Sequence, residues 1–305
     1  MSEHIVTKYV YTFSPDHEPV AKVGQGEVVT LETLDCFSNQ IHSEEDELTS
    51  VDFSKVNPAT GPVYVEGAEP GDYLVVDILD VQVAAQGIGV NGPGMGPLQD
   101  KVTNETKLIH VEDGKVKFND MEFPMNPMIG VIGVAPKEGE IPCGMPGAHG
   151  GNLDNKLIKT GARLYFPVHV EGALFQCGDL HAAMGDGEIS GAGLEVAGTV
   201  KVKFDVVKGG AGDRPVLETE DKWYTIATAE EFNDALKLAT SDMQDLLVEN
   251  YGWDKTEAAI YMSLQGDAEV CQACVPSELD LVLRFGVPKR ADKPLIKSDS
   301  EKVSV

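Results

Sequence analysis

Residues 1–225 are dominated by short runs in which apolar and polar residues alternate, with almost no helical pattern between them. Such runs, rich in β-branched side chains, are typical of strands with one buried face. The predicted strands are 28–35, 73–83, 107–118 and 199–207. Because no helix separates them, a parallel βαβ arrangement is disfavoured. The chain is therefore expected to be mainly β with some α, built as a jelly-roll-like β-sandwich.

Two features refine this expectation. The Asp-Gly pair at 113–114 predicts a hairpin turn between alternating strands. The glycine-rich stretch 91–96, NGPGMG, lacks the Gly-Lys-Ser or Gly-Lys-Thr ending of a phosphate-binding loop. We interpret this stretch as a loop that lines a pocket, and no nucleotide-binding motif is identified.

Helical periodicity begins late in the chain. Thr228 and Glu231 form a predicted capping box ahead of an apolar stripe. Asp254 and Glu257 begin a second, shorter helix that is expected to end near Gly266.

A last predicted strand, 279–287, returns the chain to the sheet. We therefore predict one structural unit over 1–305. It has a β-rich part, 1–225, and a smaller α/β portion, 226–290, with a C-terminal helical pair.

The composition excludes several function classes. The net charge is −26, from 50 acidic and 24 basic residues, which argues against binding to nucleic acid or anionic lipid. No apolar stretch approaches the ~18 residues of a membrane span, and the N-terminus lacks the basic and apolar regions of a secretion signal. The expected location is the cytoplasm.

Five scattered cysteines do not describe a disulfide framework. Cys271 and Cys274 form a CxxC pair, but a structural zinc site needs a second ligand pair, which the sequence does not offer. These thiols are interpreted as ordinary strand or loop cysteines, and a functional role for the pair is left open.

The segment 145–195 concentrates histidines, carboxylates and glycines. Imidazole and carboxylate together hold divalent metals, and they also move protons near neutral pH. Glycine lets the backbone bend sharply and approach a small ligand closely. A metal site or an acid–base site is therefore expected in this segment.

Several long motifs occur in a characteristic order: 57–72, 123–136, 146–158 and 178–195, followed by the helical pair. Together they resemble the acetamidase/formamidase family over nearly the whole chain. The resemblance implies hydrolysis of a small amide to a carboxylate and ammonia, on a jelly-roll-like sandwich with an added α/β portion. It also implies a metal ion, as found in some members, and a homo-oligomer, with a dimer favoured.

Four residues are candidate ligands of a divalent metal. Asp179 and His181 are two apart, so an extended backbone points both side chains to one face. His149 lies between two glycine-containing turns, and Asp154 is either a ligand or the cap of a turn. Zinc is favoured, and calcium, magnesium and manganese remain open. The alternative for Asp179 and His181 is a hydrogen-bonded pair at a turn.

Glu188 and Asp186 are the candidate catalytic residues. One of the two would be a ligand and the other a proton carrier, and Glu188 is favoured as the general base that acts beside a metal-activated water. Glu195 either belongs to the same site or ends the loop.

Two alternatives to the metal-assisted hydrolase stay open. Other amidases use a cysteine nucleophile, and here Cys177 and Cys143 lie close in sequence to possible bases. A non-enzymatic β-sandwich that binds a metal or a small ligand is the second alternative, because a fold alone does not decide activity.

Overall fold

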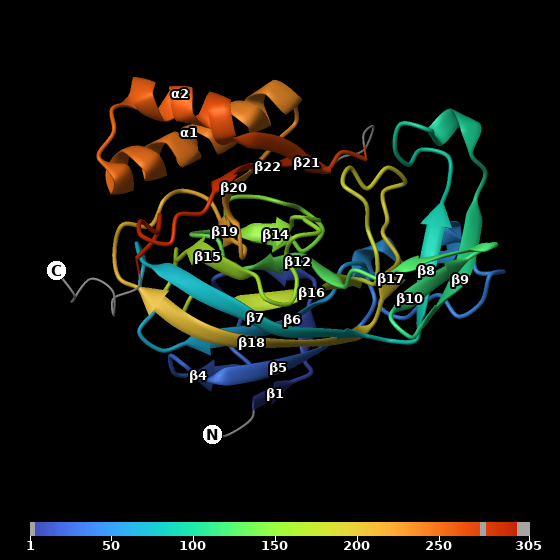
Figure 1. Ribbon diagram of the computed structural model, residues 1–305. Coiled ribbons are helices and arrows are strands. Elements are labelled where there is room, and N and C mark those ends of the chain that lie inside the picture. Colours follow the sequence, from blue (N-terminus) through green and yellow to red (C-terminus); the bar gives the residue numbers. More distant parts are fainter. Residues whose placement is uncertain (1–3, 275–278, 298–305) are drawn as a thin grey trace.

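The computed structural model describes residues 4–274 and 279–297, and within them the chain is mainly β, as predicted. Two large sheets face each other, and two helices cover one side of the molecule (Figure 1). A small third sheet pairs β3 (Thr12–Phe13) with β13 (Ile141–Pro142).

The first large sheet is mostly antiparallel, and nine described strands form it. Its longest pairing joins β7 to β18 over ten residues, with a register shift between Lys201 and Val202. In spatial order the strands are β1 (His4–Val6), β5 (Val28–Thr33), β18 (Gly198–Val207), β7 (Tyr73–Val83), β15 (Arg163–Pro167), β19 (Val216–Glu218), β20 (Lys222–Ala229), β22 (Leu281–Pro288) and β21 (Asp267–Gln272).

The second large sheet contains the strands that carry the site described below. Its main path is β11 (Met121–Pro124), β10 (Lys115–Phe118), β9 (Glu105–Glu112), β8 (Gln86–Asn91), β17 (Glu195–Val196), β16 (Phe175–His181), β12 (Met128–Gly133) and β14 (Gly150–Asn152). Off this path, β6 (Ala59–Val65) pairs with β16, β2 (Tyr9–Val10) and β4 (Ala21–Val23). Strands β8, β9 and β10 extend at the end of the molecule away from the helices (Figure 1).

The main core lies between the two large sheets. Phe204 on β18 meets Phe175 on β16 edge to face, with ring centroids 5.0 Å apart. Both rings are fully buried, as are Leu74 and Val76 on β7. Burying a side chain of this size stabilises the fold by about 1.5–3 kcal/mol. The inward residues of the alternating runs therefore hold the sandwich together.

The predicted helices are present as α1 (Phe232–Tyr251) and α2 (Lys255–Gln265). Ala235, Ala239 and Met243 of α1 are buried in a second apolar cluster that also includes residues of β20 and β22. The helical pair therefore packs on one end of the nine-stranded sheet, as Figure 1 shows.

Of the two predicted helix starts, only the one at Asp254 has the expected side-chain cap. Asp254 forms the predicted capping box with Glu257 at the start of α2. The predicted box at Thr228 and Glu231 is wrong. Thr228 lies within β20, where it pairs with Val282, and Glu231 precedes α1 without a side-chain cap. Pairing along β22 holds this segment extended for longer than its local sequence indicates.

The predicted hairpin is also present. Glu112 pairs with Lys115, and the turn residues Asp113 and Gly114 both have positive φ. The connection from β5 to β6 contains two short 3₁₀ helices, η1 (Leu48–Ser50) and η2 (Phe53–Lys55). A third, η3 (Gln99–Lys101), follows β8. No described helix is both long and apolar enough to cross a membrane.

Candidate active site

Strand β16 ends with Asp179 and His181, the pair that the spacing singled out. The Nε2 atom of His181 lies 3.5 Å from Oδ1 of Asp179. Glu195 on β17 pairs directly with His181 in the antiparallel ladder, and its Oε1 lies 3.2 Å from the same Nε2. One buried imidazole therefore lies beside two buried carboxylates.

Two loops bring further carboxylates to this place. Asp154 follows β14, and Glu188 lies in the loop between β16 and β17. With His181, these two residues offer ligand atoms that all lie within 4.8 Å of one another. A second group with the same spacing consists of Cys36, Asp179 and Glu195.

Three of the carboxylate residues have an uncommon backbone conformation. The φ angles are 38° at Asp154, 55° at Asp179 and 42° at Glu188, all in the left-handed region. This conformation costs about 1–3 kcal/mol for a residue other than glycine, and such residues cluster at active sites and ligand clamps. The turns that aim these three side chains at one place are therefore strained.

The charges at this place are crowded and shielded from water. Burial raises the pKa of Asp154 well above its usual value, and the nearby charges of Glu188 and Asp179 raise it further. Burial likewise raises the pKa of Glu188 to about 8. Burial alone would lower the pKa of His181, but the charges of Glu195 and Asp179 hold that pKa well above its usual value.

Several polar atoms here lack a partner among the described residues. They are Oδ1 of Asp154, Nδ1 of His181, Oε2 of Glu195 and Oδ1 of Asn152. Buried polar atoms nearly always have a hydrogen-bonding or metal partner. Carboxylate oxygens and an imidazole nitrogen form a donor set that suits zinc, and the excess of oxygen also suits calcium, magnesium or manganese. The residues therefore fit a divalent cation.

Gly130 on β12 permits this close arrangement. A Cβ atom added to Gly130 would lie 2.4 Å from Oδ2 of Asp179 and 2.7 Å from Oδ1 of Asp154. Both distances are far below van der Waals contact. Sequence reasoning did not select this glycine, because its neighbours belong to segments distant along the chain.

We expect Gly130→Ala to displace Asp154 and Asp179 and to lower metal content and ammonia release together. Metal analysis and ammonia assays on the purified variant test this, with Gly24→Ala as the control. Like Gly130, Gly24 does not have positive φ, but a Cβ atom added to Gly24 meets nothing closer than 3.6 Å. Normal metal content and turnover in Gly130→Ala would contradict the arrangement.

A cavity of about 700 Å³ opens beside the buried carboxylates. Part of its lining is polar, with Asp154, Asp179, His181, Glu188 and Glu195. Another part is apolar and comes largely from the β5–β6 connection. Met95 lies in the stretch 91–96 and lines this cavity, as predicted for that loop.

The structure places His149, a predicted metal ligand, in neither of the two groups. Its ring meets Phe13 edge to face with centroids 4.8 Å apart. Burial lowers the pKa of His149 to about 4, with His169 adding to the shift. The Nε2 atom of His149 is buried and has no hydrogen-bond partner among the described residues, so its role as a ligand stays a prediction.

Asp186, a predicted catalytic residue, is held in ion pairs. Its two carboxylate oxygens accept hydrogen bonds of 2.9 and 2.7 Å from Arg284, and Lys156 Nζ lies 2.8 Å away. Burial alone would raise the pKa of Asp186, but these cations hold that pKa below its usual value. Asp186 does not line the 700 Å³ cavity. Its described ion pairs with Arg284 and Lys156 hold the loop between β16 and β17 in place.

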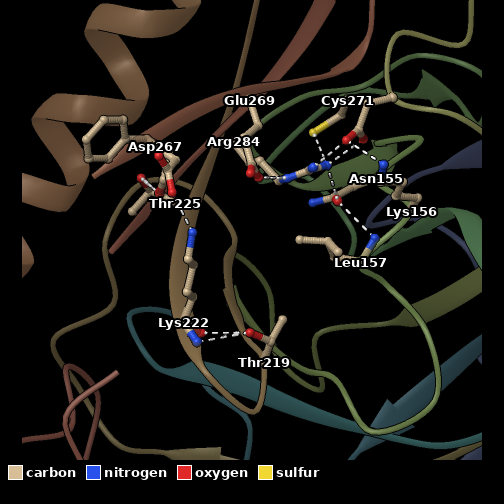
Figure 2. Close-up of polar contacts among 12 residues, drawn as sticks. Asn155, Lys156, Leu157, Thr219, Lys222, Thr225, Asp267, Glu269, Cys271 and Arg284 are labelled. Carbon is tan, nitrogen blue, oxygen red and sulfur yellow. Dashed lines mark hydrogen bonds and ion pairs between the residues drawn. The ribbon is translucent and has the colours of Figure 1, made fainter. Parts of the chain in front are cut away.

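Arg284 on β22 is 2% exposed and connects the loops of the site (Figure 2). Beyond Asp186, it donates a 3.0 Å hydrogen bond to Asn155, the neighbour of Asp154 in the chain. It also donates a 2.6 Å hydrogen bond to Glu269 on β21. Sequence analysis did not identify Arg284, because its partners are as many as 129 residues away.

Backbone hydrogen bonds attach the β16–β17 loop, which carries Glu188, to β21. The Gly187 N–H donates to the Cys271 carbonyl at 2.9 Å, and the Ala273 N–H donates to the Gly187 carbonyl at 2.9 Å. Gly187 immediately precedes Glu188. The C-terminal strands therefore fix the position of a residue that lines the cavity.

All five cysteines are buried, and none of them forms a disulfide in the part of the chain that the structure describes. Burial raises the pKa of Cys143 to about 12, and it does the same for Cys177. A thiol nucleophile needs the opposite shift, because the reactive form is the thiolate. Cys271 accepts a hydrogen bond from Arg284 at 3.6 Å, which gives this half of the CxxC pair a structural contact.

Comparison with known proteins places this geometry in context. A model of the Acetamidase/Formamidase family matches residues 7–142 and 140–241. The formamidase of Methylophilus methylotrophus is 30% identical in an alignment that covers 64% of this chain and 63% of that protein. The acetamidase of Mycolicibacterium smegmatis is 28% identical in an alignment that covers 64% of this chain and 65% of that protein. The matches thus span slightly less than two thirds of these relatives.

Two solved structures resemble the whole chain. The acetamidase of Bacillus halodurans is 43% identical with a TM-score of 0.90, and the alignment covers 93% of this chain and 97% of that one. A predicted acetamidase/formamidase of Thermoanaerobacter tengcongensis is 44% identical, also with a TM-score of 0.90, and the alignment covers 94% of this chain and 95% of that one.

Proposed function

We propose, from the premise that this chain belongs to the acetamidase/formamidase family, that it hydrolyses the C–N bond of small linear amides through a metal-activated water. The products would be a carboxylate and ammonia. The observation that carries this proposal is the meeting of Asp154, Asp179, His181 and Glu188 beside one cavity. The names of the relatives support an amide as the substrate.

Asp154, Asp179 and His181 are the residues that we propose as metal ligands. The unpartnered buried atoms of Asp154 and His181 support this role, and so do the distances from His181 to both carboxylates. A divalent metal supplies Lewis-acid polarisation of a carbonyl and lowers the pKa of water to about 7. Zinc is favoured from the mixed imidazole and carboxylate donors. Glu195, which contacts His181, would orient the imidazole ring.

Glu188 is the residue that we propose as the proton carrier. Its carboxylate lies within 4.8 Å of the ligand atoms of Asp154 and His181 and lines the cavity. In hydrolysis, a proton leaves the attacking water and another must reach the departing nitrogen, and one carboxylate can serve both transfers in turn. Anchoring of Gly187 on β21 would hold Glu188 in place for this work.

Ammonia release tests the proposal directly. Formamide, acetamide and propionamide are supplied to the protein with and without zinc, and the ammonia formed is measured. We expect release that depends on the metal. Stoichiometric metal without ammonia from any amide would favour the non-enzymatic binding protein.

A second experiment separates the metal route from a thiol route. We expect Cys143→Ala and Cys177→Ala, alone and together, to retain ammonia release per folded molecule, because burial keeps both thiols protonated. Circular dichroism and metal content confirm that each variant is intact. A loss of turnover with normal fold and normal metal content would instead support the cysteine nucleophile.

Assembly as a homo-oligomer, with a dimer favoured, is also part of the proposal. Phe118, Met121 and Phe123 lie on β10 and β11 at the edge of the second large sheet, and all three side chains are exposed. Exposed apolar strand edges are surfaces that another chain can pair with. Location in the cytoplasm stays a prediction from the sequence.

A further inference from the structure

A small buried cluster of apolar side chains packs behind the apolar part of the 700 Å³ cavity. Phe37 belongs to a small buried cluster with Cys36, Ile41 and Val51, and Leu48, Val56 and Met95 pack against that cluster. The connection from β5 to β6 supplies most of these residues. The apolar lining of the cavity consists largely of Phe37, Leu48, Phe53, Val56 and Met95.

The apolar surface of this lining is larger than the smallest amides can cover. Formamide carries only a hydrogen atom on its carbonyl carbon, and acetamide carries only a methyl group. A cavity of 700 Å³ lies in the range that holds ligands of drug size, at about 300–1,000 Å³. With acetamide bound near Asp154 and His181, the wall of Phe53 and Val56 would still face water, and the favourable burial of apolar surface would be lost.

Charge restricts the acyl group further. None of the described residues that line the cavity is lysine or arginine, whereas the lining includes the carboxylates Asp154, Asp179, Glu188 and Glu195. A substrate with a second carboxylate would meet acidic groups and no compensating cation. The lining therefore suits an uncharged acyl group.

Resting on the proposed amidase function, we propose that the substrate is a primary amide with an extended apolar acyl group, of the arylacetamide or medium-chain alkanamide class. The amide lies against the carboxylates and His181, and the acyl group lies against Phe37, Phe53 and Val56. Water adds its oxygen to the carbonyl carbon as the C–N bond breaks, and the nitrogen leaves as ammonia after taking a proton. The products are the apolar carboxylate and ammonium.

The test compares kcat/KM for acetamide, butanamide, hexanamide, phenylacetamide and succinamate, measured as ammonia release from the metal-loaded protein. We expect kcat/KM to rise about fourfold per added methylene and phenylacetamide to exceed acetamide by about 100-fold. Succinamate, which ends in a carboxylate, is expected to fall below butanamide.

Phe53→Ala tests the wall itself. Phe53 is 59% exposed, so its removal leaves the core intact. We expect the ratio of kcat/KM for phenylacetamide to that for acetamide to fall about tenfold. Phe232→Ala is the matched control, because Phe232 is an exposed phenylalanine on α1 outside the cavity, and this variant should keep the wild-type ratio.

The possible results separate the two proposals. Equal kcat/KM across the neutral amides, or a preference for acetamide, would overturn the substrate class and leave the amidase function standing. An unchanged ratio in Phe53→Ala would overturn the role of the wall. Absence of ammonia from every amide, including acetamide, would instead overturn the proposed function on which this inference rests.

Discussion

Replacing Asp154 with asparagine is expected to lower kcat/KM for amide hydrolysis by about 1,000-fold, with loss of the bound metal. Asparagine keeps the shape of the side chain but removes its charge. A metal contributes several kcal/mol to the stabilisation of the transition state, and about 1.36 kcal/mol corresponds to a tenfold change in rate. Kinetics and metal content measured on one preparation test this.

The same substitution should stabilise the metal-free protein. Burial and the charges of Glu188 and Asp179 oppose ionisation of Asp154 in the fold, so a neutral amide relieves an unfavourable interaction at neutral and higher pH. Thermal unfolding of metal-free Asp154→Asn should therefore occur above the wild-type temperature, while activity is lost. Such opposite changes are typical of functional residues.

Asp72→Asn is the matched control. Asp72 is as buried as the site carboxylates, but it pairs with Lys208 and lies outside the cavity. We expect this variant to lose stability and to keep its kcat and metal content. If Asp154→Asn kept full metal content and turnover, Asp154 would have no role as a ligand.

Replacing Arg284 with methionine is the second change with a large expected effect. The substitution leaves Asp186 and Glu269 without their buried cation. Breaking a buried pair costs about 3–5 kcal/mol, and the low end applies because both carboxylates keep about a third of their surface in water. Activity should fall about 10–100-fold per folded molecule, as for residues that position metal ligands.

The reason for the loss of activity is geometric. Arg284 holds Asn155, next to Asp154, and Asp186, two residues before Glu188. Arg284→Lys keeps the charge but not the planar guanidinium that reaches several partners at once, so it should recover stability better than activity. Urea unfolding and steady-state kinetics on both variants measure these two effects separately.

Arg214→Met provides the matched control for Arg284. Arg214 donates two 3.0 Å hydrogen bonds to Asp242 on α1, in an ion pair that does not line the 700 Å³ cavity. We expect it to lower stability with kcat and metal affinity unchanged. If Arg284→Met likewise lost stability alone, Arg284 would support the fold without positioning the site.

Local sequence patterns predicted much of the fold. Alternating residues identified β7 with its observed bounds, and the Asp-Gly turn and the cap at Asp254 were also found. These signals depend on residues close together in the chain. The cap at Thr228 was wrong because pairing with β22, more than fifty residues later, keeps that segment extended.

The candidate site was predicted less completely. The spacing of Asp179 and His181 placed both on one strand, and Glu188 and Asp154 lie beside them as well. Glu195 was given less weight than its contact with His181 merits, because strand pairing creates that contact. Asp186 was predicted to be catalytic from its spacing to Glu188, and local sequence gave no sign of its ion pair with Arg284, which lies 98 residues away.

We propose that the carboxylates and the imidazole around His181 hold a divalent metal needed for amide hydrolysis. Elemental analysis of protein purified without chelator, paired with ammonia release before metal removal, after removal and after zinc is restored, tests it most directly. We expect a stoichiometric divalent metal, with activity that disappears and returns together with it. Full ammonia release from protein free of metal would contradict it.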